Sequence, residues 1–391
     1  MKTLGIFTVK YFCFHQGEYY TYGGFGSYLN EIRKHFEKTI LVAHVQKNKK
    51  PPNGFYKVDL GTDLSIVHLP PAYHPLKLVL CLPIMVYKSF KAIQHMDLVH
   101  ARMPDYTGVI GAFLCKLKGT PVFCQIIDDW FVLANSISPM RSFGLGVIMK
   151  LYLYIYDFTE RLAAKNTLVF AQGRTAYLKH KNNAETYMTI STAHRKEEVI
   201  EPSVRFKNGR KRILNVGRLN GVKNQALIIH ALKALREKGE DWAFDHIGEG
   251  NRRESLEKLT SELGLQEYVQ FHGKVAYGDA LWKFFDRADV FVLSSRSEGT
   301  PKVILEALAR GLPVVASSVS GVPDTILNEE RGLLFEDNNP KQLLECLKRM
   351  SEDRCLREKC QSQGSEFAIE NSIEIQTQWT VGIVRKKFQN L

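Results

Sequence analysis

The sequence predicts an α/β protein of two domains, each built on a parallel β-sheet that is covered by helices. The length of 391 residues is ample for two domains. Strand-like apolar runs alternate with helix-like runs along the whole chain, which is the pattern of parallel sheets with helical connections. The polar, Arg- and Lys-rich segment Glu201–Arg212 indicates a linker. We therefore expect one domain in residues 1–204 and a second in residues 205–372.

The composition is that of a globular protein with a strongly basic balance. The formal net charge is +12 and the isoelectric point is near 9.2, which favours an anionic partner. A nucleotide diphosphate or an acidic membrane surface would fit, whereas nucleic acid is not expected, because no RNA-binding or helix-turn-helix pattern occurs. Seven scattered cysteines without metal-ligand spacing indicate reduced thiols. No apolar run is long enough for a signal peptide or a membrane span, so we expect a cytoplasmic protein.

The first predicted strand is Leu4–Val9, and it leads into a long loop that contains several glycines. A helix at Ser27–Lys38 and a strand at Thr39–His44 are expected to follow. The loop includes Gly23 and Gly24, and glycines between a strand and a helix let the backbone approach a phosphate. A flexible turn is the alternative interpretation.

Two long apolar stretches lie in the same half. Leu76–Tyr87 is almost entirely apolar and is followed by Lys88 and Lys91, while Pro83 would kink or end a helix. Packing in the core and exposure toward a membrane both remain open for this stretch. Phe143–Leu162 contains five aromatic residues with scattered charges, and we interpret it as a core helix.

Polar groups follow the next predicted strands. Asp97–Arg102 is a short buried strand with polar groups at its end, and Val122–Ile127 runs directly into Asp128 and Asp129. Such strand ends line the ligand crevice of open α/β sheets. The acidic pair could bind an acceptor hydroxyl, cap the next segment or be solvated.

A second α/β unit starts after the linker with the strand Ile213–Gly217. The turn that follows contains Arg218 and Lys223. Two cations five residues apart across a strand–helix turn can neutralise a pyrophosphate without a metal ion. Ordinary loop charge is the alternative.

The most informative stretch is Ser294–Gly311. A short apolar strand precedes it, Thr300 is a suitable N-cap, Pro301 fits the first helical position, and Gly311 ends the helix. The N–H groups of Gly299, Thr300 and the first turn would favour an anion such as a phosphate.

Two carboxylates accompany that helix. Glu306 lies inside the apolar helix, where a buried carboxylate needs hydrogen-bond donors such as the two hydroxyls of a ribose. Glu298 lies in the preceding loop and could hold the hydroxyls of a second sugar. The alternative is two solvated glutamates.

This stretch, with the frame Ser-x-x-Glu-Gly-x-Pro-x-x-x-Leu-Glu-Ala-x-Ala-x-Gly-x-Pro-Val-Val from Ser295 onward, resembles the signature of glycosyltransferase family 4. That family comprises retaining, nucleotide-sugar-dependent enzymes of GT-B fold. The resemblance extends to the turn with Arg218 and Lys223, to the strand ends at Gly248 and Val275, and to Ser320–Asp324. The sequence departs from the family where Ser320 replaces a glycine and where the acidic pair 128–129 replaces a histidine.

The resemblance implies a role for each matching residue. Arg218 and Lys223 would stabilise the departing diphosphate, where negative charge grows. Glu298 with Gly299, Thr300 and Pro301 would hold the sugar. Glu306 would hold the ribose. Further donor contacts would come from Gly23, Gly24, Gly248 and Val275. Asp128 and Asp129 remain candidates on the acceptor side.

The resemblance also implies the overall organisation: two Rossmann-like domains facing a cleft, with the acceptor at the first, the donor at the second, and a terminal helix at about 373–391 packing back. The expected reaction moves a sugar from a nucleotide diphosphate sugar, a co-substrate rather than a cofactor, to a glycan or lipid-linked glycan in bacterial cell-surface polysaccharide synthesis. No Asp-x-Asp pair occurs, so no metal is expected. The protein would be cytoplasmic, with peripheral association with the inner face of the membrane.

Three alternatives remain. An epimerase or a phosphorylase on the same fold would also bind a nucleotide sugar. A non-catalytic nucleotide-sugar-binding protein would bind it without turnover.

Overall fold

The computed structural model describes residues 2–47, 50–72, 75–127, 143–182, 184–206 and 209–388. The chain forms two compact units, Met1–Ser191 with Glu374–Leu391, and Thr192–Ile373. Asp128 and Asp129 lie outside the described residues.

The first unit contains a nine-stranded sheet whose parallel part has the order β5-β3-β1-β6-β7-β8-β9. When these seven parallel strands are numbered along the chain, their order in the sheet is 3-2-1-4-5-6-7, which is the doubly wound arrangement of a Rossmann-like domain. Its parallel strands are β1 (Thr3–His15), β3 (Lys38–Lys47), β5 (Leu64–Leu69), β6 (Leu98–Met103), β7 (Val122–Ile126), β8 (Leu168–Gln172) and β9 (Glu185–Thr189).

Helices cover both faces of this sheet. One face packs on α2 (Pro75–Ile93), α3 (Tyr106–Lys118), α5 (Phe143–Ala164) and α6 (Arg174–His180). The other face packs on α1 (Phe25–Arg33) and α14 (Ile373–Lys387), the latter through Val381 and Val384. The last helix therefore belongs to the core of the first unit, although the rest of that unit precedes residue 192.

The structure differs from the sequence prediction in the segment before α1. The strand predicted to end at Val9 continues to His15, and the expected loop is a hairpin with β2 (Glu18–Tyr22), which in turn pairs with β4 (Phe55–Val58). The many aromatic residues in both strands favour this hairpin over a loop. Helix α1 begins before the predicted Ser27, at Phe25, and ends before the predicted Lys38, at Arg33.

Helix α2 runs without interruption through Pro83. Proline removes the N–H that would bond to the carbonyl of Val79 four residues earlier. Because Val79 is exposed on the surface, water can satisfy that carbonyl, which makes the proline tolerable in this helix.

The second unit contains a six-stranded parallel sheet of order β12-β11-β10-β13-β14-β15. This is again the Rossmann order 3-2-1-4-5-6. The strands are β10 (Lys211–Val216), β11 (Trp242–Ile247), β12 (Val269–Phe271), β13 (Val290–Leu293), β14 (Val314–Ser317) and β15 (Leu333–Phe335).

Two apolar clusters, one on each face, hold the helices to this sheet. The first cluster involves α7 (Gln225–Glu237), α8 (Arg253–Glu262) and α12 (Pro340–Glu352). The second involves α9 (Asp279–Arg287), α10 (Lys302–Ala309) and α11 (Val322–Ile326). Helix α13 (Arg354–Glu370) contributes to both, and a short 3-10 turn, η1 (Lys196–Glu198), begins the unit.

The basic segment interpreted as a linker is anchored within the second unit. The buried Arg205 guanidinium donates hydrogen bonds to the carbonyl oxygens of Asp286 (2.6 Å), Ala288 (2.9 Å) and Arg310 (2.8 Å). These bonds tie the segment to the ends of α9 and α10.

Candidate active site

The sheet order of the second unit locates a ligand site. Strands β11 and β12 lie on one side of β10, whereas β13, β14 and β15 lie on its other side. The topological switch point is therefore between the paired strands β10 and β13. Open α/β sheets bind ligands at this point, outside the carboxyl ends of the strands. Strand β10 leads into Arg218 and Lys223, and β13 leads into Glu298 and Gly299. The residues singled out in the two loops therefore flank one switch point.

The two loops are hydrogen-bonded to each other. The Asn220 side chain accepts from the backbone N–H groups of Val222 (3.1 Å) and Lys223 (3.0 Å), closing the turn after β10. The Ser294 hydroxyl, at the end of β13, donates to the Lys223 carbonyl oxygen (2.9 Å). The Arg296 N–H donates to the Val222 carbonyl oxygen (2.8 Å). This network fixes the backbone on which Lys223 is carried.

Asn220 and Ser294 were missed in the sequence analysis. Asparagine at the start of a turn is a common signal for a side chain that closes that turn. Ser294 lies directly after an apolar strand, and its hydroxyl has no sequence signal that distinguishes it from an ordinary strand end.

Lys223 and Glu298 form an ion pair in the ligand-free protein. The Lys223 Nζ lies 2.5 Å from the Glu298 Oε1, and the Glu298 side chain is only 9% exposed. Arg218, by contrast, is exposed, and no described residue pairs with its guanidinium. Arg218 is therefore available to an anion, whereas Lys223 is held by the Glu298 carboxylate.

Helix α10 begins one residue later than predicted. Pro301 is the N-cap, with an extended backbone (φ −72°, ψ 106°), and Lys302 is the first helical residue. The prediction of Thr300 as N-cap and Pro301 as first helical residue was therefore wrong by one position. The helix ends at Ala309, and Gly311 follows with φ 56°, in the left-handed conformation expected after a helix.

The first turn of α10 presents its backbone N–H groups at the end of the loop that carries Glu298 and Gly299. N–H groups at the start of a helix point out of its N-terminus, and the helix dipole adds partial positive charge there. Both effects favour a bound anion.

Glu306 is buried inside α10, with 7% of its surface exposed. Burial raises the pKa of its carboxyl to about 7, an effect that nearby Glu198 reinforces and Lys302 opposes. Among the described residues, no hydrogen-bond donor contributes to the pKa of this carboxyl. A ligand with two neighbouring hydroxyls would supply the missing donors.

Two glycines let backbone segments meet around the switch point. A Cβ at Gly248 would lie 1.8 Å from the Gly217 carbonyl oxygen, and Gly248 has φ 138°. A Cβ at Gly321 would lie 2.3 Å from the Gly299 carbonyl oxygen. Only glycine fits at Gly248 and Gly321 without displacing a neighbouring loop.

Ser320 lies where the glycosyltransferase family that the sequence resembles has a glycine. Its φ is 47°, in the left-handed region that side chains rarely adopt.

The remaining predicted residues are placed as follows. Val275 lies after β12, half-buried against the cluster that includes Leu281. Gly23 and Gly24 belong to the first unit, where Gly24 is the N-cap of α1 and Gly23 has φ 65°.

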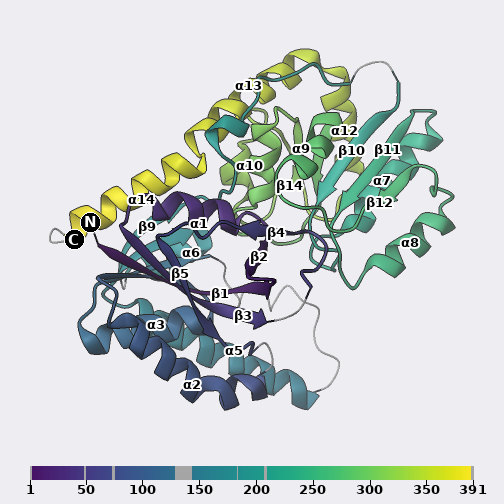
Figure 1. The fold of residues 1–391 in the computed structure, drawn as a ribbon. Helices are drawn as coiled ribbons and strands as arrows, with labels where there is room; N and C mark the ends of the chain where they lie inside the picture. The colour runs from purple at the N-terminus through teal and green to yellow at the C-terminus, as the bar shows by residue number, and fades with distance from the viewer. Residues whose placement is uncertain are drawn as a thin grey trace. The chain divides into compact units, whose positions relative to one another are not determined.

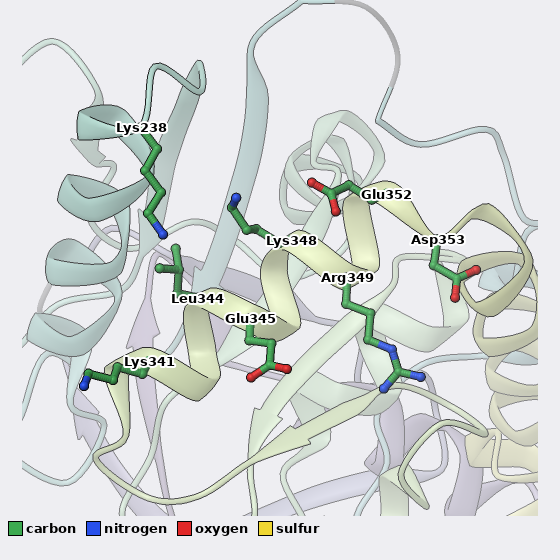
Figure 2. Close-up of a pocket in the computed structure, with 8 residues that line it drawn as sticks. All are labelled: Lys238, Lys341, Leu344, Glu345, Lys348, Arg349, Glu352 and Asp353. Atoms are coloured by element: carbon green, nitrogen blue, oxygen red, sulfur yellow. The ribbon is translucent and has the colours of Figure 1, made fainter.

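A separate open groove lies along α12, and Figure 2 shows the eight side chains that line it. Lys348 lies 3.3 Å from Glu240, and Arg349 lies 2.6 Å from Glu329. None of the predicted site residues lines this groove. Within the described part of the chain, no group of three or more His, Cys, Asp or Glu side chains could hold a metal ion.

Comparison with known proteins identifies the family of this unit. Residues 196–367 match the model of the family Glycosyl transferases group 1. The second unit is a group 1 glycosyltransferase domain. A transferase from Campylobacter jejuni, named for adding N-acetylgalactosamine to a diphospho-undecaprenol-linked acceptor, is 35% identical over 148 residues, which are 38% of this chain and 39% of that protein. The matches span about two fifths to half the length of the curated relatives.

Solved structures establish the fold over the whole chain. Sucrose-phosphate synthase from Thermosynechococcus elongatus has a TM-score of 0.77 at 17% identity, with complete coverage of both chains. HepE from Anabaena, solved with UDP-glucose, has a TM-score of 0.70 at 14% identity and covers 98% of this chain and 100% of HepE. The predicted fold class, two Rossmann-like domains of GT-B type, is confirmed.

Proposed function

We propose that the protein is a glycosyltransferase that moves a sugar from a nucleotide diphosphate sugar to a hydroxyl of a glycan or lipid-linked glycan. The observation that carries the proposal is the grouping of Arg218, Lys223 and Glu298 at one switch point, beside the first turn of α10. The group 1 domain and the UDP-glucose bound by HepE support a nucleotide-sugar donor.

The proposed chemistry follows from the charges at the site. The bond between the anomeric carbon and the diphosphate oxygen breaks, and its electron pair leaves with the diphosphate. Arg218 and Lys223 stabilise the charge that develops there, together with the N–H groups of α10. The acceptor oxygen bonds to the anomeric carbon with retention, and its proton passes to the departing phosphate. No metal ion is required by this scheme.

The donor would be held in three parts. Glu306 binds the ribose hydroxyls, Glu298 and the backbone of Gly299 to Pro301 bind the sugar, and Val275 flanks the base. Gly248 leaves room for the backbone around the phosphates. Gly23 and Gly24 of the first unit complete the donor contacts, and Asp128 or Asp129 contacts the acceptor.

We further propose that the acceptor is lipid-linked and used in cell-surface polysaccharide synthesis. The Campylobacter relative is named for a diphospho-undecaprenol-linked acceptor, which supports this class. The protein would then work in the cytoplasm, at the inner face of the cell membrane.

The test is a transfer assay with a panel of nucleotide diphosphate sugars and a mixture of soluble and lipid-linked glycans. We expect acceptor-dependent release of nucleoside diphosphate, lost in Lys223→Ala and retained in Lys348→Ala, a matched removal of a lysine in the separate groove on α12. Conversion of the nucleotide sugar without acceptor would instead indicate an epimerase. Phosphate-dependent release of sugar phosphate from a glycan would indicate a phosphorylase, and binding without turnover would indicate a non-catalytic protein.

A further inference from the structure

The outer side of the helices on one face of the first unit is unusually apolar. Helix α3 packs against both α2 and α5, so the three helices form one layer over the sheet (Figure 1). Large apolar side chains on this layer are exposed to solvent: Val79, Leu80, Leu82, Ile84, Tyr87 and Phe90 on α2, Leu117 on α3, and Leu151, Tyr154, Ile155, Phe158 and Leu162 on α5. Exposed apolar patches of this extent mark interaction surfaces.

The exposed apolar side chains of α5 contradict the interpretation of this segment as a core helix. The side chains from Leu151 to Leu162 recur at i, i+3, i+4, i+7 and i+11, which places them on one face of the helix. That face points to solvent, and Phe158 remains 66% exposed. The opposite face supplies the buried Ala163 and Ala164. The apolar stripe of α5 therefore faces away from the core.

Ion pairs hold α5 in this orientation. Lys179 of α6 lies 2.5 Å from Asp157 and 2.8 Å from Glu160, and His180 lies 3.0 Å from Glu160. The Glu160 side chain is almost completely buried. Rolling α5 to bury its apolar stripe would expose or break these contacts, so the stripe is fixed outward.

The charges on this layer are almost all positive. Within the described side chains of the three helices and the residue that follows α5, the cations are Lys77, Lys88, Lys91, Lys116, Lys118, Arg161 and Lys165. The acidic residues there are Asp157 and Glu160, and both are ion-paired. Lys91 and Lys118 lie over aromatic rings of the apolar surface, with Nζ 4.9 Å from the Tyr87 centroid and 4.3 Å from the Phe90 centroid.

We infer that the outer faces of α2, α3 and α5 form one docking surface for an anionic lipid bilayer, with the helices lying along the membrane interface. Apolar side chains would enter the boundary of headgroups and acyl chains while the lysines meet anionic headgroups. A second copy of this chain fits less well, because self-association would bring the cations together. None of the helices in the described ranges is long and apolar enough to cross a bilayer. The inference deepens, and rests on, the proposed lipid-linked acceptor.

The test is co-sedimentation of the full chain with phosphatidylcholine vesicles that contain or lack phosphatidylglycerol. We expect binding to the anionic vesicles at low salt, weakened at high salt. Leu80→Glu combined with Phe158→Glu should reduce binding at least tenfold, and Lys77→Glu combined with Lys91→Glu should reduce it and flatten the salt dependence. Val204→Glu is the matched control, because Val204 is 68% exposed in the second unit.

Thermal unfolding of each variant checks that the fold is retained, and transfer to a soluble acceptor separates this inference from the proposed function. Vesicle binding without any sugar transfer would support the surface and contradict the transferase. Absence of binding to anionic vesicles, or binding unchanged in the Leu80→Glu, Phe158→Glu variant, would overturn the membrane surface. So would a dimer that Phe158→Glu dissociates and that does not bind vesicles.

Discussion

The Lys223 ammonium is ion-paired with the Glu298 carboxylate, 2.5 Å away, across the switch point of the second unit. In the proposed donor complex these groups part: Lys223 binds the diphosphate and Glu298 binds the sugar. The ligand-free pair therefore competes with donor binding. It also keeps both side chains close to the positions in which they would act.

The first prediction concerns this competition. Glu298→Gln removes the carboxylate charge, so free nucleoside diphosphate should bind about 3–10-fold more tightly, corresponding to about 1 kcal/mol for the loss of this largely buried pair. Sugar transfer should nevertheless fall, because the glutamine binds the sugar hydroxyls less strongly. Isothermal titration with the diphosphate and initial-rate assays measure the two effects. Weaker diphosphate binding in Glu298→Gln would contradict the competition.

The second prediction concerns the ribose contact. Glu306→Ala should weaken nucleotide binding by about 1.5–3 kcal/mol, the range for hydrogen bonds to a charged group. The fold should persist, because the substitution removes a costly buried carboxyl. Nucleotide titration of the variant measures the loss. Unchanged affinity in the folded variant would remove Glu306 from the donor site.

The third prediction follows from the pKa of Glu306, which burial raises from 4.5 to about 7. The folded protein holds a proton that the unfolded chain releases, so stability should fall as pH rises from about 4.5 to 7, by about 3 kcal/mol in total. Glu306→Gln should abolish this part of the pH dependence in urea unfolding. Ribose hydroxyls favour the carboxylate, so nucleotide binding near pH 6.5 should release a proton. Calorimetry in buffers of different ionisation enthalpy detects that proton, and its absence would argue against a ribose diol at Glu306.

The sequence predicted the elements at the switch point better than the contacts between them. Strand β13, the loop with Glu298 and the buried Glu306 follow from apolar runs, glycine and proline positions, which are local signals. The Lys223–Glu298 pair joins residues 75 apart, and only the strand order brings them together.

Two elements were misjudged for related reasons. The glycines after Val9 indicated one long loop, but Gly17 lies in the turn of a hairpin and Gly23 follows its second strand, while β2, which lies between them, pairs with β1. In α5 the spacing of apolar residues defines a stripe without saying which side meets the sheet. The buried Glu160 and its partners on α6 decide that orientation, and this contact is not visible in the sequence.

The fourth prediction concerns charge stabilisation in the reaction. Arg218→Ala and Lys223→Ala should each lower kcat by about 10²–10³-fold, the range for losing one group that stabilises developing negative charge. Acceptor KM should change much less, because neither side chain contacts the acceptor in the proposed scheme. Activity should persist in excess chelator. Complete loss with chelator, restored by magnesium or manganese, would show that a metal ion shares this role.

The last prediction uses two glycines that differ in the space around them. A Cβ at Gly299 would meet no atom within 4 Å, whereas a Cβ at Gly321 would lie 2.3 Å from the Gly299 carbonyl oxygen. Gly321→Ala should therefore displace the loop, lowering stability by about 1–3 kcal/mol and weakening every donor ligand. Gly299→Ala should change stability by less than about 0.5 kcal/mol.

If the donor sugar packs against Gly299, the substitution Gly299→Ala should weaken binding of the nucleotide sugar by about tenfold. Binding of the nucleoside diphosphate should stay unchanged. Thermal unfolding and paired titrations with the two ligands make the comparison within one protein. Equal weakening of both ligands would place the diphosphate, rather than the sugar, against Gly299. Unchanged binding of both would move the sugar away from this loop altogether, because a methyl group in the open space beside Gly299 must collide with any sugar that occupies it.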